Sequence, residues 1–213
     1  MEYSEDLNDL KKVKRLGIMG GSFNPPHVGH FLMAESAMNE LSLDKVLFIP
    51  TGRIAYKPEH DRASGIHRYR MLKTVVDRNP GFCITDMEIA SPEITYTANT
   101  LKRLKTELPD TRLNFIVGAD SLDYMDKWYS PETIFKLCTV AAMNRSDIPE
   151  ERFLSKIEYL RDRFSADIRV IDMPYVDVSS TELRERIHSG RSIRYLCDDE
   201  IIEYISKNKL YIK

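Results

Sequence analysis

The sequence predicts an α/β protein built on a Rossmann-like, doubly wound parallel sheet, with a small helical appendage at its C-terminal end. Two observations support this fold class. Short apolar runs typical of buried strands alternate along the chain with longer segments whose apolar residues recur at helical spacing. A glycine-rich turn, residues 20–30, follows the first apolar run, at the place where α/β proteins locate their binding sites.

Length and composition fit a single globular core. Of the 213 residues, 42% are hydrophobic and 30% are charged, which is ordinary for one soluble domain with a good core. We expect an N-terminal extension over residues 1–14, an α/β domain over 15–190, and a helical appendage over 191–213 packed on that domain. The net charge of −2 argues against a protein that coats nucleic acid.

Cysteine usage and hydropathy indicate the compartment. Three widely spaced cysteines, odd in number and without a C-x-x-C pair, favour reduced thiols. The N-terminus carries no apolar signal core, and no apolar run approaches the length of about 18 residues that a membrane span needs. We therefore expect a soluble cytoplasmic protein with small-molecule partners, no nucleic-acid partner and no membrane partner. Association into a homo-oligomer is left open.

The first predicted elements frame the glycine-rich turn. Residues 16–19 predict a short buried strand, and residues 31–41 predict an amphipathic helix that begins near His27. Residues 45–50 then predict a second strand, which ends at a proline.

A basic loop that leads into a helix interrupts this pattern over residues 51–70. Charged runs of this kind are often only solvated surface. Because the loop follows the carboxyl end of the second strand, on the same rim as His27, we expect it to act as a lid that faces phosphates. Its basic residues are Arg53, Lys57, His60, Arg62, His67, Arg68 and Arg70.

The later elements continue the alternation. Strands are predicted at residues 83–89, 113–120, 138–143 and 168–173, and helices from residue 96, over 150–164, from residue 179 and in the tail after residue 193. Ser179, followed three residues later by Glu182, indicates a capping box at the start of its helix.

The residues of the turn favour an anionic ligand. Its glycines let the backbone pass close to a ligand, and the helix that follows offers unpaired N–H groups. His27 and His30 lie on one face of the first helical turn. Zinc fits less well because no cysteine or acidic partner lies at metal-site spacing. The turn also matches neither the dinucleotide-binding fingerprint nor the P-loop. The alternative is that the two histidines only cap the helix.

Two motifs carry a resemblance to a known family. Residues 21–30 match G-x-F-[DN]-P-x-H-x-G-H, and residues 179–184 match [ST]-[ST]-x-x-[IL]-R at the separation expected for one complete domain. Together they resemble the nucleotidyltransferases related to class I aminoacyl-tRNA synthetases. Within that superfamily the chain is similar, along nearly its whole length, to the bacterial nicotinate-nucleotide adenylyltransferases. One departure, Cys197-Asp198-Asp199 in place of a common Val-Pro pair, is expected to loosen a turn without affecting the chemistry.

The resemblance implies an activity and a metal. It implies an adenylyltransferase of NAD biosynthesis that joins ATP and nicotinate mononucleotide to give deamido-NAD and pyrophosphate. Mg²⁺ is expected to arrive bound to the ATP phosphates, with no ligand from the protein. Three alternatives stay open: nicotinamide mononucleotide as the acceptor, phosphopantetheine as the acceptor, or a nucleotide sensor without catalysis.

Candidate site residues follow from these motifs. We expect His27, His30 and Arg184 to be catalytic because they can neutralise charge on a triphosphate. Residues expected to bind ATP are Gly20, Gly21, Ser22, Phe23, Lys57, Gly118, Asp120, Ser179 and Ser180. The resemblance implies that the mononucleotide is bound by Asn24, Tyr96, Thr97, Trp128 and Tyr129. For Trp128, stacking on a pyridine ring competes with core packing, the commoner role of an isolated tryptophan.

Overall fold

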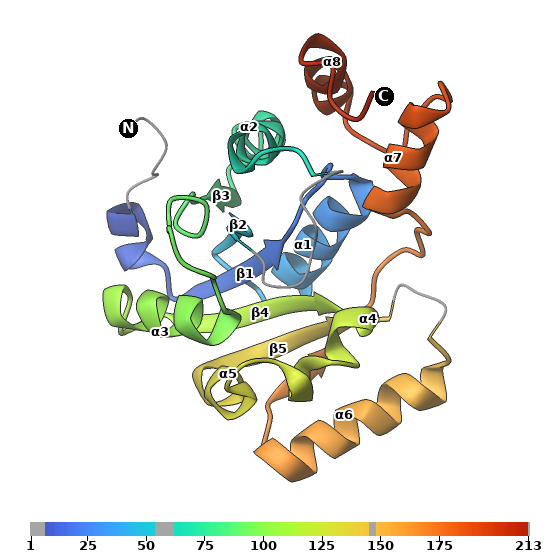
Figure 1. The fold of residues 1–213 in the computed structure, drawn as a ribbon. Helices are drawn as coiled ribbons and strands as arrows, with labels where there is room; N and C mark the ends of the chain where they lie inside the picture. The colour runs from blue at the N-terminus through green and yellow to red at the C-terminus, as the bar shows by residue number, and fades with distance from the viewer. Residues whose placement is uncertain (1–6, 54–61, 145–147, 213) are drawn as a thin grey trace.

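The computed structural model describes residues 7–53, 62–144 and 148–212. Six described strands form one parallel sheet in the order β3-β2-β1-β4-β5-β6 (Figure 1). Their bounds are β1 Arg15–Gly21, β2 Lys45–Pro50, β3 Phe82–Ile84, β4 Arg112–Gly118, β5 Cys138–Met143 and β6 Ile168–Val170. This order reverses direction at β1, which confirms the predicted doubly wound sheet.

Helices cover both faces of the sheet. On one face α3 (Thr97–Glu107), α5 (Pro131–Leu137) and α6 (Glu150–Phe164) pack against buried strand residues, and on the other face α1 (Val28–Glu40) and α2 (Gly65–Val76) do so. The shorter elements are the 3₁₀ helices η1 (Leu7–Lys12) and η3 (Met125–Lys127) and the single-turn helix α4 (Ala119–Leu122). Apolar side chains alternate between the two faces along the strands, so one sheet supports two cores.

The last two helices, α7 (Ser180–His188) and α8 (Asp199–Lys207), lie beside α1 and α2 (Figure 1). Buried side chains from α2, α7 and α8 form a third apolar group, which we call the C-terminal cluster. Its buried members are Met71, Val178, Leu183, Ile193, Cys197, Ile201 and Ile205. This cluster joins the end of the chain to the helices that flank the glycine-rich turn.

Most predicted elements have the expected positions, with two exceptions. β6 covers only residues 168–170 of a strand predicted over 168–173. β3 covers only residues 82–84, although a strand was predicted over 83–89. Beyond Ile84 the chain turns, because Ala90 N–H bonds the Asp86 carbonyl and Met87 N–H bonds Oγ1 of Thr85. The apolar alternation that predicted a strand belongs instead to a folded turn with buried side chains. Within the described residues, no helix is both long enough and apolar enough to cross a membrane.

Candidate active site

The two histidines contact each other at the start of α1. His27 is the N-cap residue, and its backbone N–H donates to Nδ1 of His30 over 3.1 Å. Their ring centroids lie 3.7 Å apart. Because Nδ1 of His30 accepts a hydrogen bond, the proton of the neutral ring belongs on Nε2, which is then a donor. His27 is only 1% exposed, whereas His30 is partly exposed.

The backbone carbonyls of the turn are bonded by side chains from distant parts of the chain. Proline has no N–H, so the Pro25-Pro26 pair cannot build a regular ladder, and buried carbonyls need other donors. Arg68 donates to Ser22 O (2.8 Å), Arg184 to Asn24 O (2.9 Å), Ser180 to Pro25 O (2.8 Å) and Cys197 to Pro26 O (3.0 Å). The conformation of the turn is therefore set by four side chains from three separate segments: α2, α7 and the segment that precedes α8.

Cys197 contacts the glycine-rich turn directly. That its presence in place of a Val-Pro pair loosens its own turn stays a prediction. Burial raises the pKa of the Cys197 thiol to about 12, so the thiol stays protonated and donates to Pro26. The neighbouring Leu196 carbonyl accepts from Val28 N–H at 3.1 Å, which fastens the tail directly to the first turn of α1.

The N-terminus of α7 faces the same turn. Ser179 caps the helix, since its Oγ accepts from Glu182 N–H at 3.1 Å. In the described residues only this half of the predicted capping box forms, because the Glu182 carboxylate pairs with Arg186 Nε at 2.8 Å. Arg184 bonds Asn24 O and, at 3.3 Å, Oγ1 of Thr181. The structure thus brings the two sequence motifs together across more than 150 residues.

The glycines and the adjacent aromatic residue have different positions. Gly20 is exposed, and Gly21 and Ser22 are partly exposed at the end of β1. Phe23 is 0% exposed and packs edge-on against the ring of His30, with 4.9 Å between centroids. Its backbone has a φ of 46°, and a Cβ at Gly21 would lie 3.1 Å from its ring. Phe23 therefore supports the turn from its buried side, so any effect of Phe23 on ATP binding is indirect.

The end of β4 lies on the same rim. β1 and β4 are neighbours in parallel register, with Ile18 opposite Phe115. Gly118 is the buried last residue of β4, and Asp120 is exposed in the first turn of α4. An exposed carboxylate here can accept hydrogen bonds from ribose hydroxyls beside the turn.

Aromatic side chains gather at the start of α3. Tyr96 is the N-cap residue of α3, Thr97 is its first residue, and the Tyr96 ring lies 4.6 Å from the ring of Tyr129. Tyr129 is 53% exposed. Trp128 is half-buried and packs edge-on against Phe115. Tyr129 is the most exposed of these three rings, and stacking by Trp128 on a ligand stays a prediction.

Arg68 has a structural position that the sequence did not indicate. It was predicted within a phosphate-facing lid, but it lies on α2, is only 2% exposed and bonds the carbonyls of Ser22, Thr51 and Ala63. Burial, with Arg62 beside it, lowers the pKa of Arg68 to about 10, so the side chain remains cationic at neutral pH. It fastens the turn to the end of β2.

Glu88 is a buried carboxylate near the start of α3. Its oxygens accept from the hydroxyls of Thr95 (3.0 Å) and Thr100 (2.6 Å), which flank Tyr96 and Thr97. Burial raises the pKa of Glu88, and bonds from the two hydroxyls and from Gly52 N–H oppose this effect. Glu88 thus fixes the segment that precedes α3.

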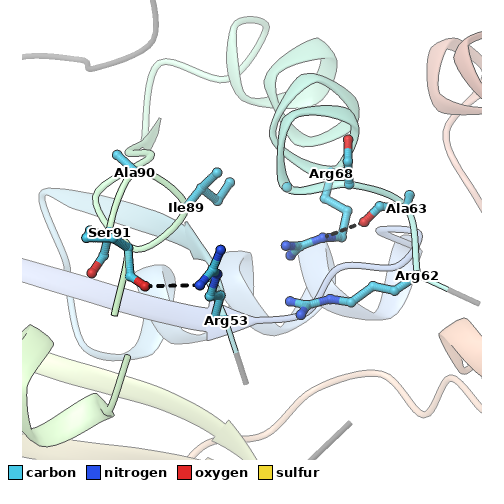
Figure 2. Close-up of a pocket in the computed structure, with 11 residues that line it drawn as sticks. Arg53, Arg62, Ala63, Arg68, Ile89, Ala90 and Ser91 are labelled. Carbon is cyan, nitrogen blue, oxygen red and sulfur yellow. Dashed lines mark hydrogen bonds between the residues drawn. The ribbon is translucent and has the colours of Figure 1, made fainter. Parts of the chain in front are cut away.

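A pocket of about 560 Å³ lies between the end of β2, the start of α2 and the 89–92 loop (Figure 2). Figure 2 shows Arg53, Arg62 and Arg68 on its walls. Arg62 bonds Thr51 through its carbonyl and hydroxyl, and Arg53 bonds the Pro92 carbonyl at 3.4 Å. Three guanidinium groups make this wall basic. Lys57, predicted to steer phosphates, lies outside the described residues.

Comparisons with known proteins decide the family. A family model described as cytidylyltransferase-like matches residues 18–186. A Lachnoclostridium phytofermentans protein named "Probable nicotinate-nucleotide adenylyltransferase" is 38% identical over 94% of this chain and 100% of its own length. A Rhodopirellula baltica protein of the same name is 39% identical over 92% of each chain. This chain belongs to the nicotinate-nucleotide adenylyltransferase family.

Solved structures agree with this family at the level of the fold. Plasmodium falciparum nicotinic acid mononucleotide adenylyltransferase, solved in complexes with APC and with NaAD, superposes with a TM-score of 0.76. The match covers 93% of this chain and 97% of the other at 21% identity. In this adenylyltransferase chain, most of the candidate site residues lie at the carboxyl ends of β1 and β4 and at the first turns of α1, α3 and α7.

Proposed function

We propose that this protein transfers the adenylyl group of ATP to nicotinate mononucleotide in the cytoplasm, giving deamido-NAD and pyrophosphate. The observation that carries this proposal is the meeting of two helix N-termini, those of α1 and α7, at one turn with His30 and Arg184. Helix N-termini and cationic side chains suit a polyphosphate. The shared name of relatives that match over nearly their full length supports the choice of acceptor.

The proposed chemistry is a direct displacement at phosphorus. An oxygen of the acceptor's 5′-phosphate forms a bond to the α-phosphorus of ATP, and the bond to the oxygen that bridges to the β-phosphorus breaks. The electron pair of that bond leaves with pyrophosphate. The attacking phosphate is already an anion, so the protein contributes by positioning both substrates and by neutralising charge on the phosphate oxygens.

The geometry suggests a role for each residue of the turn and of α7. His30 can donate from Nε2 to a phosphate oxygen, with His27 fixing its ring. Arg184 uses one nitrogen on Asn24 O and one on Thr181, and a guanidinium carries five N–H groups, so further donors remain for pyrophosphate. Ser180 commits its hydroxyl proton to Pro25 O, so its contribution is its backbone N–H in the first turn of α7.

The acceptor is proposed to lie beside the first turn of α3. Tyr96 and Tyr129 offer ring surface for a pyridine, and backbone N–H groups near Thr97 and Tyr129 can hold a carboxylate. Among the described residues, no group of three or more His, Cys, Asp and Glu side chains could cage a metal. We propose that Mg²⁺ is held by ATP phosphate oxygens and water and shields their charge.

A panel of acceptors tests the proposal. With Mg·ATP fixed, pyrophosphate release is measured with nicotinate mononucleotide, nicotinamide mononucleotide and phosphopantetheine. We expect kcat/KM to favour the acid over the amide at least tenfold, which corresponds to about 1.4 kcal/mol of transition-state binding. Activity with phosphopantetheine alone would overturn the proposal.

A histidine variant separates catalysis from mere nucleotide binding. His30→Ala should bind ATP but release pyrophosphate at least 100-fold more slowly. His188→Ala removes a histidine from the last turn of α7, away from the first turns of α1 and α7, and should keep activity within about twofold of the wild type. A wild-type protein that binds ATP and forms no product with any acceptor would instead be a sensor.

A further inference from the structure

We infer that Tyr211 is a positioning residue for the acceptor: its hydroxyl holds the side-chain amide of Asn24 in one orientation. The assignment rests on the proposed function, in which Asn24 belongs to the mononucleotide site. Tyr211 lies 187 residues from Asn24, as the last residue of a Y-I-x-x-x-x-L-Y segment that begins at Tyr204.

Two hydrogen bonds identify which atom of the Asn24 side-chain amide is the oxygen and which is the nitrogen. The Tyr211 hydroxyl donates to Oδ1 of Asn24 at 2.8 Å, and the backbone N–H of Ala63 donates to the same oxygen at 2.9 Å. A backbone N–H can only donate, so the atom that faces Ala63 must be the oxygen. The Nδ2 end is therefore directed away from Tyr211 and Ala63. Asn24 is only 6% exposed, so a wrong orientation would bury a mismatched polar group.

The backbone of Tyr211 is held in a costly conformation. Its φ of 61° lies in the left-handed region, which costs on the order of 1 kcal/mol for a residue with a side chain. Tyr211 and Leu210 pack against the C-terminal cluster, which opposes this cost. A strained residue that places a hydroxyl on a site residue is typical of a functional position.

The hydroxyl of Tyr211 is a permanent donor. Burial raises the pKa of the phenol above its usual value, and this effect outweighs the opposing influence of Arg184 and Arg68 nearby. The phenol therefore stays protonated over the working pH range and can donate to Asn24 throughout.

The turn's other contacts limit what the loss of this hydroxyl can do. The carbonyls of Asn24, Pro25 and Pro26 accept from α7 and from Cys197, and none of these hydrogen bonds involves the Tyr211 hydroxyl. The histidines should therefore keep their places when the Tyr211 hydroxyl is removed. We expect the defect to fall on the mononucleotide and to spare ATP.

Tyr211→Phe, with Tyr204→Phe as the matched control, tests the assignment. Tyr204 is another tyrosine of the C-terminal region, and its hydroxyl bonds Nδ1 of His67 at 2.9 Å. We expect Tyr211→Phe to lower kcat/KM for nicotinate mononucleotide about tenfold, mainly through KM, with KM for ATP within about twofold of the wild type. Tyr204→Phe should leave both KM values within about twofold. Melting temperatures establish that both variants are folded.

Two Asn24 backgrounds show whether Tyr211 acts through Asn24. In Asn24→Ala the side-chain oxygen that accepts the hydrogen bond from Tyr211 is gone. Adding Tyr211→Phe to this variant should therefore change kcat/KM for nicotinate mononucleotide by less than about twofold. In Asn24→Asp an oxygen remains, so Tyr211→Phe should again cause a clear loss. These comparisons between paired variants hold even if Tyr211→Phe lowers the melting temperature.

Three outcomes overturn the assignment. The first is a KM for nicotinate mononucleotide that is unchanged in Tyr211→Phe, and the second is an equal fall in kcat/KM in Tyr204→Phe. The third is a double variant, Asn24→Ala with Tyr211→Phe, whose fall in kcat/KM is the product of the two single falls. A wild-type protein that forms no deamido-NAD refutes the proposed function itself and the Tyr211 role with it. An active wild type with an unaffected Tyr211→Phe refutes only the Tyr211 role.

Discussion

Arg68 and Glu88 are buried charges on which the walls of the site depend. A buried charge is costly unless hydrogen bonds replace its water. Arg68 meets this need with three backbone carbonyls, and Glu88 with two hydroxyls and a backbone N–H. The two side chains attract each other. Arg68 fixes the glycine-rich turn, and Glu88 fixes the segment that leads into α3.

The raised pKa of Glu88 predicts a pH dependence of stability. Burial raises its pKa in the folded state above the unfolded value, so the stabilisation is complete below the unfolded pKa and is lost as pH rises through the folded pKa. Glu88→Gln cannot ionise. We expect the unfolding free energy of the wild type, minus that of Glu88→Gln, to fall as pH rises above about 4, the ordinary pKa of an unfolded glutamate. Urea unfolding at several pH values measures this difference, and a rise over the same range would contradict the expectation.

Residue-level prediction succeeded where two motifs agreed and failed where the contact is distant. The proximity of Arg184 to the histidine turn followed from the paired motifs, and the structure brings them together. Tyr211, Glu88 and the buried position of Arg68 were missed because their partners are set by tertiary packing. Neither hydropathy nor spacing distinguishes a buried, carbonyl-bonded arginine from one in a solvated loop.

At the scale of elements, the N-terminus of α7 has two separable functions, capping and phosphate binding. Ser179→Ala removes the cap and should lower the unfolding free energy by about 1 kcal/mol. Ser179→Asp keeps a capping oxygen and should remain as stable as the wild type. Its carboxylate would repel pyrophosphate, so we expect a fall in activity of at least tenfold. Urea unfolding and pyrophosphate release measure the two effects.

The same pair of variants can contradict the role given to α7. If Ser179→Asp were both stable and fully active, pyrophosphate would not lie at this helix end. If Ser179→Ala were as stable as the wild type, the hydrogen bond from Glu182 N–H would contribute nothing measurable to the helix.

Elements with clear boundaries were predicted well. The bounds of β2, β5 and α6 match the sequence prediction because a proline or a polar turn ends each apolar run. β3 was predicted too long because Met87 and Ile89 continue the alternation of apolar residues. Their side chains are buried or half-buried within a turn, and a period of two cannot distinguish that turn from a strand.

At the scale of the whole molecule, the C-terminal cluster links the end of the chain to the helices α1 and α2 that pack beside it. Ile201 is 0% exposed within it, so Ile201→Ala should lower the unfolding free energy by about 2–4 kcal/mol. Trp128, the single tryptophan, packs against the core on the other face of the sheet and reports its unfolding by fluorescence. We expect the fluorescence and circular dichroism transitions of the variant to shift together.

Separate transitions would mean that the tail folds on its own. In that case circular dichroism would show an early loss of helix while the Trp128 signal kept its wild-type midpoint. The predicted boundary near residue 190 would then separate two units that unfold independently. A common transition would place residues 191–213 in the same cooperative unit as the sheet.

The hydrogen-bond partners of the glycine-rich turn are translated later than the turn itself. The ribosome translates β1 and both histidines before it translates the residues whose side chains form hydrogen bonds to that turn. Those residues are Arg68, Ser180, Arg184, Cys197 and Tyr211. A nascent chain therefore lacks several side-chain partners of this turn until late in translation, and the hydrogen bond from Tyr211 to Asn24 can form only after residue 211 has been added.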